Sequence, residues 1–119
     1  MNIFLACNVL NLYQHMMEWI EIIRLRTQPD VEPSVLQWLK EMIRSMNGTP
    51  GLNEAKIYTH SAIPGDISLH IMWDTVQGLF KESEVGLMIA DTLQKYGMLD
   101  HTVWLMEAMN GKDARRVTV

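Results

Sequence analysis

The chain has 119 residues, of which 48% are hydrophobic and 20% are charged, and its formal net charge is −4. A chain of this length fits one domain with one hydrophobic core. The single cysteine, Cys7, excludes an intramolecular disulfide and a clustered-cysteine zinc site, and the acidic balance argues against nucleic-acid binding, which needs a clustered basic face. We therefore expect a soluble single-domain protein of a reducing compartment, the cytoplasm.

The two ends of the chain differ in composition from its middle. Residues 1–17 contain no Asp, Glu, Lys or Arg, and their apolar runs are too short for a secretory signal or for a membrane span of about 20 residues. Two interpretations of residues 1–16 remain open: a leader segment on the surface, or an extension before a translation start at Met16-Met17. Residues 110–119 are expected to form a flexible tail. The predicted domain is therefore residues 17–109, with no membrane partner.

The first half of this domain predicts a strand, a helix and a second strand. Glu18–Thr27 is rich in β-branched and aromatic residues, which is typical of a strand. A helix is expected to open at Pro33 and to end at Asn47-Gly48, because apolar residues recur at helical spacing between them. Leu52–Ser61 is then predicted to form the second strand.

The second half predicts a strand, a helix and a last strand. A turn at Pro64-Gly65-Asp66 leads into Ile67–Trp73, which alternates between the two sheet faces and pairs with the second strand as an antiparallel hairpin. Ser83 is predicted to cap the second helix and Gly97 to follow it as a C′ glycine, before a last strand at Leu99–Ala108. The order β-α-β-β-α-β predicts an α+β, ferredoxin-like fold: an antiparallel four-stranded sheet with both helices on one face.

Alternation along the strands assigns the two faces of the sheet. Ile67, Leu69 and Ile71 are expected to lie under the helices, as are Val103 and Leu105. The opposite face combines polar and apolar side chains from all four strands: Ile20, Ile22, Arg24, Tyr58, His60, Ser68, His70, Met72, Trp104 and Met106. A face open to water would not carry so much apolar area. We therefore expect a homodimer in which two such faces close into an α/β barrel.

The polar residues of that face are the candidate site. His60, His70 and Tyr58 are the candidate catalytic residues, because histidine titrates near neutral pH and a tyrosine hydroxyl can bind a phenolic or enolate oxygen. Whether the two histidines lie directly opposite each other depends on the turn register. The predicted ligand-binding residues are Arg24, Tyr58, His60, Ser68, His70, Met72, Trp104 and Met106. The alternative is that these polar groups only satisfy one another inside a dimer.

Other candidate residues are given structural roles. A metal site is not expected, because no third ligand accompanies the two histidines. His101 is assigned to the turn before the last strand, Trp73 to packing, and Trp19 to a rim or dimer contact. The sequence contains no Gly-rich phosphate loop, nucleophile elbow or HExxH motif, so NTPase, hydrolase and metalloprotease activities have no support.

These features together resemble the dimeric α/β-barrel superfamily, near the antibiotic-biosynthesis-monooxygenase-like domains. The resemblance covers residues 17–109 and rests on the element order and on four segments: Ile20–Arg26, Thr49-Pro50-Gly51, the hairpin from Tyr58 to Trp73, and Leu99–Trp104. It implies a homodimer with a partly apolar interior pocket that acts as a cofactor-independent monooxygenase on a small aromatic or polyketide-like compound. A non-catalytic ligand-binding or structural dimer is the alternative. The superfamily also includes haem-degrading enzymes, but no cofactor is expected here, and the resemblance assigns no catalytic residue.

Overall fold

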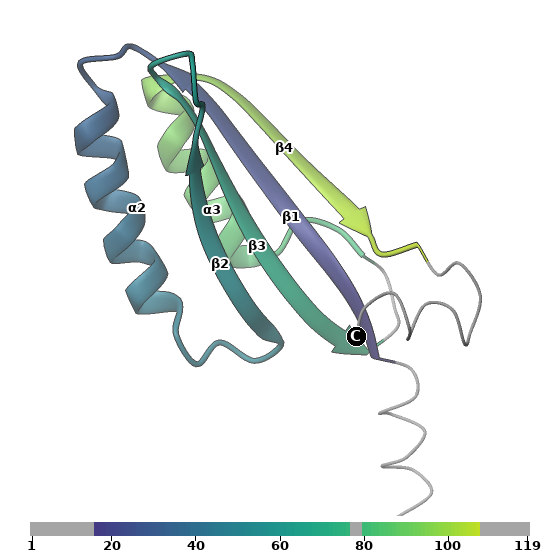
Figure 1. Cartoon of the computed structure of the whole chain (residues 1–119). Helices are drawn as coiled ribbons and strands as arrows, with labels where there is room; N and C mark the ends of the chain where they lie inside the picture. Colours follow the sequence, from purple (N-terminus) through teal and green to yellow (C-terminus); the bar gives the residue numbers. More distant parts are fainter. Residues whose placement is uncertain (1–15, 77–79, 108–119) are drawn as a thin grey trace, which may run out of the picture.

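The computed structural model describes residues 16–76 and 80–107. These residues form a four-stranded antiparallel sheet in the order β2-β3-β1-β4, with both helices against the same face (Figure 1). The elements in chain order are β1 (Met16–Thr27), α2 (Glu32–Met46), β2 (Leu52–Thr59), β3 (Asp66–Val76), α3 (Glu84–Leu93), the short 3-10 helix η1 (Gln94–Tyr96) and β4 (Gly97–Leu105). The predicted ferredoxin-like fold is confirmed. Residues 1–15 and the tail 110–119 lie outside the described residues.

The central strands are longer than the sequence pattern predicted. β1 begins at Met16 rather than Glu18, and β3 continues beyond Trp73 to Val76. The two strands pair from Met16 opposite Val76 to Arg26 opposite Asp66. In β3, backbone pairing with β1 therefore holds the polar residues Asp74 and Thr75 in the ladder, where apolar alternation alone gives no strand signal.

The hydrophobic core lies between the sheet and the helices. Ile67, Leu69 and Ile71 are each no more than 2% exposed, which confirms the predicted helix-side face. The prediction that Trp19 lies at a rim or dimer contact is wrong. Trp19 shares one face of β1 with the other buried residues of that strand and belongs to this core. Its ring stacks on Trp73 with the centroids 5.6 Å apart.

Two predictions near the ends of α3 and β4 need correction. Gly97 is not a left-handed C′ glycine, because η1 follows α3 and Gly97 is already extended as the first residue of β4. A glycine is needed there because a Cβ would collide with the backbone oxygen of Arg26. Leu105, which was expected under the helices, is 51% exposed where β4 ends.

The cap predicted for α3 is confirmed. The Ser83 hydroxyl accepts a hydrogen bond of 2.9 Å from the Gly86 N–H. This bond satisfies one of the backbone donors that a helix leaves unpaired at its first turn. None of the helices in the described part of the chain is long and apolar enough to cross a membrane.

Candidate functional site

The sheet face opposite the helices carries side chains in rows that run across the strands. Three rows are fixed by the strand register. The first row is Tyr58, Ser68, Arg24 and Asp100; the second is Lys56, His70, Ile22 and Thr102; the third is Glu54, Met72, Ile20 and Trp104. We call this surface the open face. Polarity therefore falls along the strands, from the charged first row to the more apolar third row.

The first row borders a hollow of about 470 Å³ at the end of the sheet. Its lining residues come from β1, β2, β3 and the end of the β2–β3 hairpin: Ile22, Arg24, Tyr58, Thr59, His60, Asp66 and Ser68. Four of them were predicted as ligand-binding residues. Asp66 was missed, because a Pro-Gly-Asp sequence predicts a turn and gives no sign that the aspartate also lines a site.

Tyr58, Ser68 and His70 form one contact cluster on the open face. The rings of Tyr58 and His70 have centroids 4.6 Å apart, and Nε2 of His70 lies 3.0 Å from the Ser68 hydroxyl. Partial burial lowers the pKa of His70 below its ordinary value of 6.5. The imidazole is therefore neutral near pH 7, which is the form that can accept a proton.

Arg24 and Asp66 form a two-point ion pair at the other side of the hollow. Nε and Nη2 of Arg24 lie 3.0 Å and 2.7 Å from the two carboxylate oxygens. Asp66 is only 3% exposed. The hydrogen bonds from Arg24 hold the pKa of Asp66 below its ordinary value, and the same contact raises the pKa of Arg24. The Asp66 carboxylate therefore stays ionised although little water reaches it.

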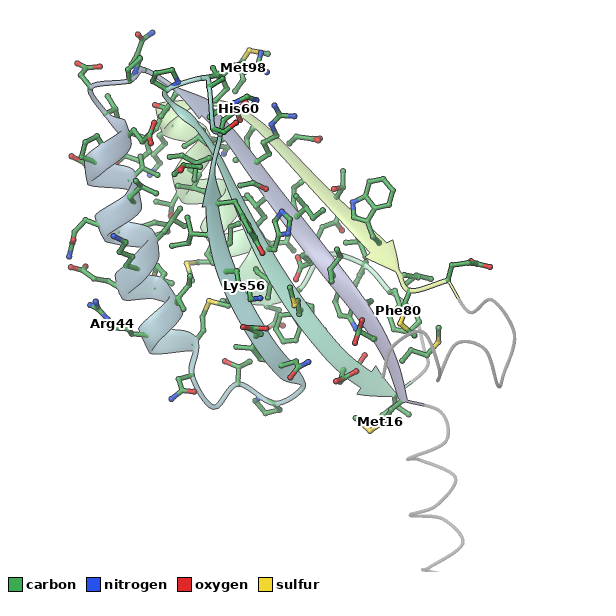
Figure 2. The ribbon with its side chains drawn as sticks, in the orientation of Figure 1. Met16, Arg44, Lys56, His60, Phe80 and Met98 are labelled. Atoms are coloured by element: carbon green, nitrogen blue, oxygen red, sulfur yellow. The ribbon has the colours of Figure 1, made fainter. Side chains whose placement is uncertain are left out.

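The two candidate histidines do not lie together. His70 pairs across the hairpin with Lys56, whereas His60 follows the last residue of β2. Nδ1 of His60 accepts backbone hydrogen bonds from Ala62 and Ile63, each 3.0 Å long. His60 thus caps the hairpin turn at the end of the sheet, while Lys56 lies further along β2 (Figure 2).

The remaining predicted ligand residues lie toward the other end of the open face. Trp104 is 56% exposed and sits opposite Ile20, and Met72 sits opposite Ile20 on the other side of β1. Met106 follows β4 and is 40% exposed. None of these three lines the hollow of the first row. The predicted site therefore divides into a polar end and an apolar end.

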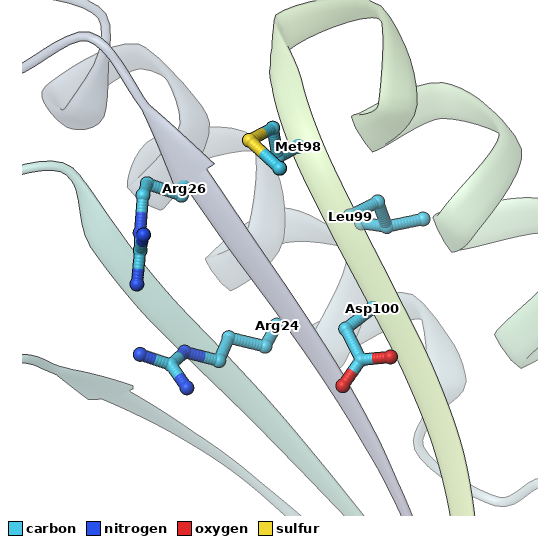
Figure 3. Close-up of a pocket in the computed structure, with 5 residues that line it drawn as sticks. All are labelled: Arg24, Arg26, Met98, Leu99 and Asp100. Atoms are coloured by element: carbon cyan, nitrogen blue, oxygen red, sulfur yellow. The ribbon is translucent and has the colours of Figure 1, made fainter.

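A second, smaller hollow adjoins the first row on its β4 side. It measures about 210 Å³ and is lined by Arg24, Arg26, Met98, Leu99 and Asp100. Figure 3 shows the guanidinium groups of both arginines on the β3 side of β1, with Asp100 across on β4. Arg26 approaches Asp66 only to 3.9 Å. Arg24 is the one residue that lines both hollows, so the two lie on either side of its side chain.

A buried polar cluster that the sequence analysis missed lies on the helix side of the sheet. Glu21 is fully buried and accepts three hydrogen bonds: from the Trp73 indole at 2.8 Å, the Ser83 backbone N–H at 3.1 Å and His101 Nε2 at 2.7 Å. His101 is therefore a partner of Glu21 rather than a turn residue. Trp73 packs in the core and also donates a hydrogen bond to Glu21. Period-two alternation from Trp19 to Ile23 places Glu21 on the buried face and would have revealed it.

Within residues 16–76 and 80–107, no three His, Cys, Asp or Glu side chains gather in the way that metal ligands do. The carboxylate of Glu21 uses its oxygens on protein donors, and Asp66 uses both of its oxygens on Arg24. Both buried carboxylates are thus committed to protein partners.

Comparisons with known proteins identify the fold. No protein-family model and no curated protein matches the chain. Among solved structures, a conserved protein from Methanosarcina mazei Go1 matches with a TM-score of 0.63 and 13% identity, over 80% of this chain and 98% of that one. An antibiotic biosynthesis monooxygenase matches with a TM-score of 0.55 and 16% identity, over 77% and 99%. A candidate antibiotic biosynthesis monooxygenase from Nitrosomonas europaea matches with a TM-score of 0.59 and 15% identity, over 82% and 95%.

The chain therefore has the fold of the antibiotic-biosynthesis-monooxygenase-like structures, as the sequence resemblance implied. At these identities the likeness concerns the fold alone.

Proposed function

We propose that the chain binds a small aromatic or polyketide-like compound on its open face and oxygenates it with O₂, without a cofactor. The observation that carries this proposal is the contact of Tyr58, His70 and Ser68 beside a hollow of about 470 Å³. A volume of about 300 to 1,000 Å³ with a few convergent polar groups is typical of small-molecule sites. The names of two structural neighbours support the reaction class.

The proposal includes a homodimer formed through the open face. Trp104 is 56% exposed and Met98 is 76% exposed. Both helices lie on the other side of the sheet (Figure 1). Apolar area of this kind is stabilised when it is buried against a second copy of the same face. Two opposed sheets would also enclose the hollow and exclude water from it.

The proposed reaction begins with proton transfer to His70. The neutral ring takes a proton from an acidic C–H or O–H of the substrate, and the Tyr58 hydroxyl donates a hydrogen bond to the resulting enolate or phenolate oxygen. The electron-rich carbon reacts with O₂ to give a peroxide anion, which takes the proton back from His70 and becomes a hydroperoxide. Loss of water then converts a CH₂ group between two aromatic rings into a carbonyl: two hydrogens and one oxygen atom leave as water, and no external reductant is consumed.

The enzyme hypothesis is tested with 1,8-dihydroxyanthrone, in which a CH₂ group lies between two aromatic rings. We expect O₂ uptake and quinone formation in a 1:1 ratio. Because general-base catalysis contributes about 10² to 10⁴-fold, His70→Gln should lower kcat by about 10²-fold or more. Lys56→Gln, at the neighbouring position in the second row, is the matched control and should retain the rate.

Binding of the anthrone without any turnover above the uncatalysed rate would contradict the enzyme hypothesis and favour the non-catalytic alternative. The dimer is tested separately by sedimentation velocity at micromolar concentration. We expect a dimer that Trp104→Glu converts to monomer, because a charge there would be buried without a partner. A monomeric wild-type chain would contradict the proposed enclosure of the site.

A further inference from the structure

We infer that the compound bound at the open face carries a carboxylate, which is held at the charged end of the sheet by Arg26 and His60. This inference rests on the proposed function, because it names the substrate class of the same site. The ligand class would be an aromatic carboxylic acid whose ring lies over the first row, beside Tyr58, and extends toward Ile22 of the second row.

Apart from Asp66, each polar side chain that lines the larger hollow can donate a hydrogen bond. Arg24 supplies a guanidinium group, and Tyr58, Thr59 and Ser68 supply hydroxyls. Asp66 is the one carboxylate in the lining, and it is buried and bonded through both oxygens to Arg24. The hollow therefore offers donors to a ligand while its own negative charge is already neutralised.

The hairpin turn fixes His60 as a further donor. Both backbone N–H groups that reach Nδ1 require this nitrogen to carry a lone pair, so the proton of the neutral ring is on Nε2. Protonation of Nδ1 would cost both turn bonds. His60 lines the hollow, so its ring is suited to donate a hydrogen bond to a ligand oxygen rather than to take a proton from it.

At the charged end of the sheet, Arg26 is less engaged with protein carboxylates than Arg24 is. Its side chain is 59% exposed, and its approach to a carboxylate among the described residues is the 3.9 Å contact with Asp66. Asp100 lines the same smaller hollow from β4, but no ion pair joins it to either arginine. A planar guanidinium group binds a carboxylate through two parallel hydrogen bonds, which makes Arg26 the specific contact.

The two hollows supply room for such a ligand at one end of the sheet. The larger measures about 470 Å³ and the smaller about 210 Å³, and they share the Arg24 side chain. His60 and Met98 lie at this same end (Figure 2). A carboxylate between Arg26 and the hairpin turn therefore leaves the aromatic part of the ligand beside the Tyr58–His70 cluster.

The test compares two fluorescent probes of nearly equal shape, anthracene-2-carboxylate and anthracene-2-carboxamide, titrated into the full chain at pH 7. We expect the acid to bind about tenfold more tightly, since a hydrogen bond to a charged group is worth about that factor. Arg26→Gln should remove this preference by weakening acid binding while leaving amide binding unchanged. Lys56→Gln removes the same charge from the same face outside both hollows and should preserve the preference.

A second variant tests His60 while conserving the turn. In His60→Asn the side-chain oxygen can accept the same turn N–H groups, but the ring N–H is lost. We expect a smaller, several-fold weakening for the acid alone. Equal affinity of the wild type for acid and amide would contradict the carboxylate site and leave the proposed function standing. Failure of both probes to bind would contradict both, and an equal loss of preference in Lys56→Gln would show general charge attraction instead of a site.

Discussion

Two carboxylates are removed from water on opposite faces of the same sheet, and they are compensated in different ways. Glu21, on the helix side, accepts hydrogen bonds from β3, from the residue before α3 and from β4. Asp66, on the open side, is paired with one half-exposed arginine of β1. Glu21 joins several parts of the fold through mostly uncharged donors, whereas Asp66 positions a cationic side chain that lines a hollow.

Glycines beside the two carboxylates show the same contrast. A Cβ on Gly86 would collide with a carboxylate oxygen of Glu21, so the first turn of α3 is packed directly on that group. A Cβ on Gly65 would collide with the backbone oxygen of Thr27, and Gly65 also has a positive φ of 88°. On the helix side, the glycine therefore makes room for a side chain. In the hairpin on the open side, the glycine makes room for backbone.

The largest expected effect follows removal of the Glu21 carboxylate. Glu21→Ala leaves three donors unpaired in a dry interior and opens a cavity, so we expect a loss of about 3 to 5 kcal/mol in the free energy of unfolding. Glu21→Gln keeps the shape but turns an amide N–H toward a donor, and should cost about 1 to 3 kcal/mol. Urea denaturation measures both. A wild-type midpoint for Glu21→Gln would show that Glu21 does not join these elements.

A smaller effect is expected when the two glycines are replaced by alanine. Overpacking at Gly86 should cost about 1 to 3 kcal/mol. The clash is with a side chain, so the cost of Gly86→Ala should fall sharply when Glu21 is already alanine. Gly65→Ala should cost at least as much, because its clash is with backbone and its φ is positive, and this cost should be unchanged in an Asp66→Asn background. Urea denaturation measures these costs. If the cost of Gly86→Ala were the same with and without the Glu21 side chain, the two glycines would not differ in the way proposed here.

The sequence predicted most of the fold, because strand alternation and helix periodicity are local properties. Ile67, Leu69 and Ile71 were assigned to the buried face correctly from alternation alone. The same alternation places Trp19 and Glu21 on that face. The burial of Glu21 was not predicted, because a buried glutamate without hydrogen-bond donors is costly. Its side-chain donors, Trp73 and His101, come from distant parts of the chain.

The candidate site was predicted less completely, because its geometry depends on register and on turn contacts. Tyr58, Ser68 and His70 were placed on one face by alternation, and the structure brings them into contact. His60 looked equivalent to His70, but strand β2 ends before it and its ring caps the turn. No local pattern reveals that Asp66 of the turn reaches Arg24, which lies 42 positions earlier in the chain.

The smallest expected effect is the pH dependence that Asp66 contributes. Its folded pKa lies below its ordinary value of 3.8, chiefly because Arg24 hydrogen-bonds to it, so the folded state holds its proton less tightly than the unfolded state does. This stabilisation is present above the unfolded pKa and is lost as the pH falls through the folded pKa. Wild type should thus exceed Asp66→Asn in urea midpoint at pH 6 and approach it at pH 2.5. A constant difference in urea midpoint across that range would mean that packing, rather than the charge on Asp66, stabilises the open side. Of the two buried carboxylates, only Glu21 would then stabilise the fold through its polar partners.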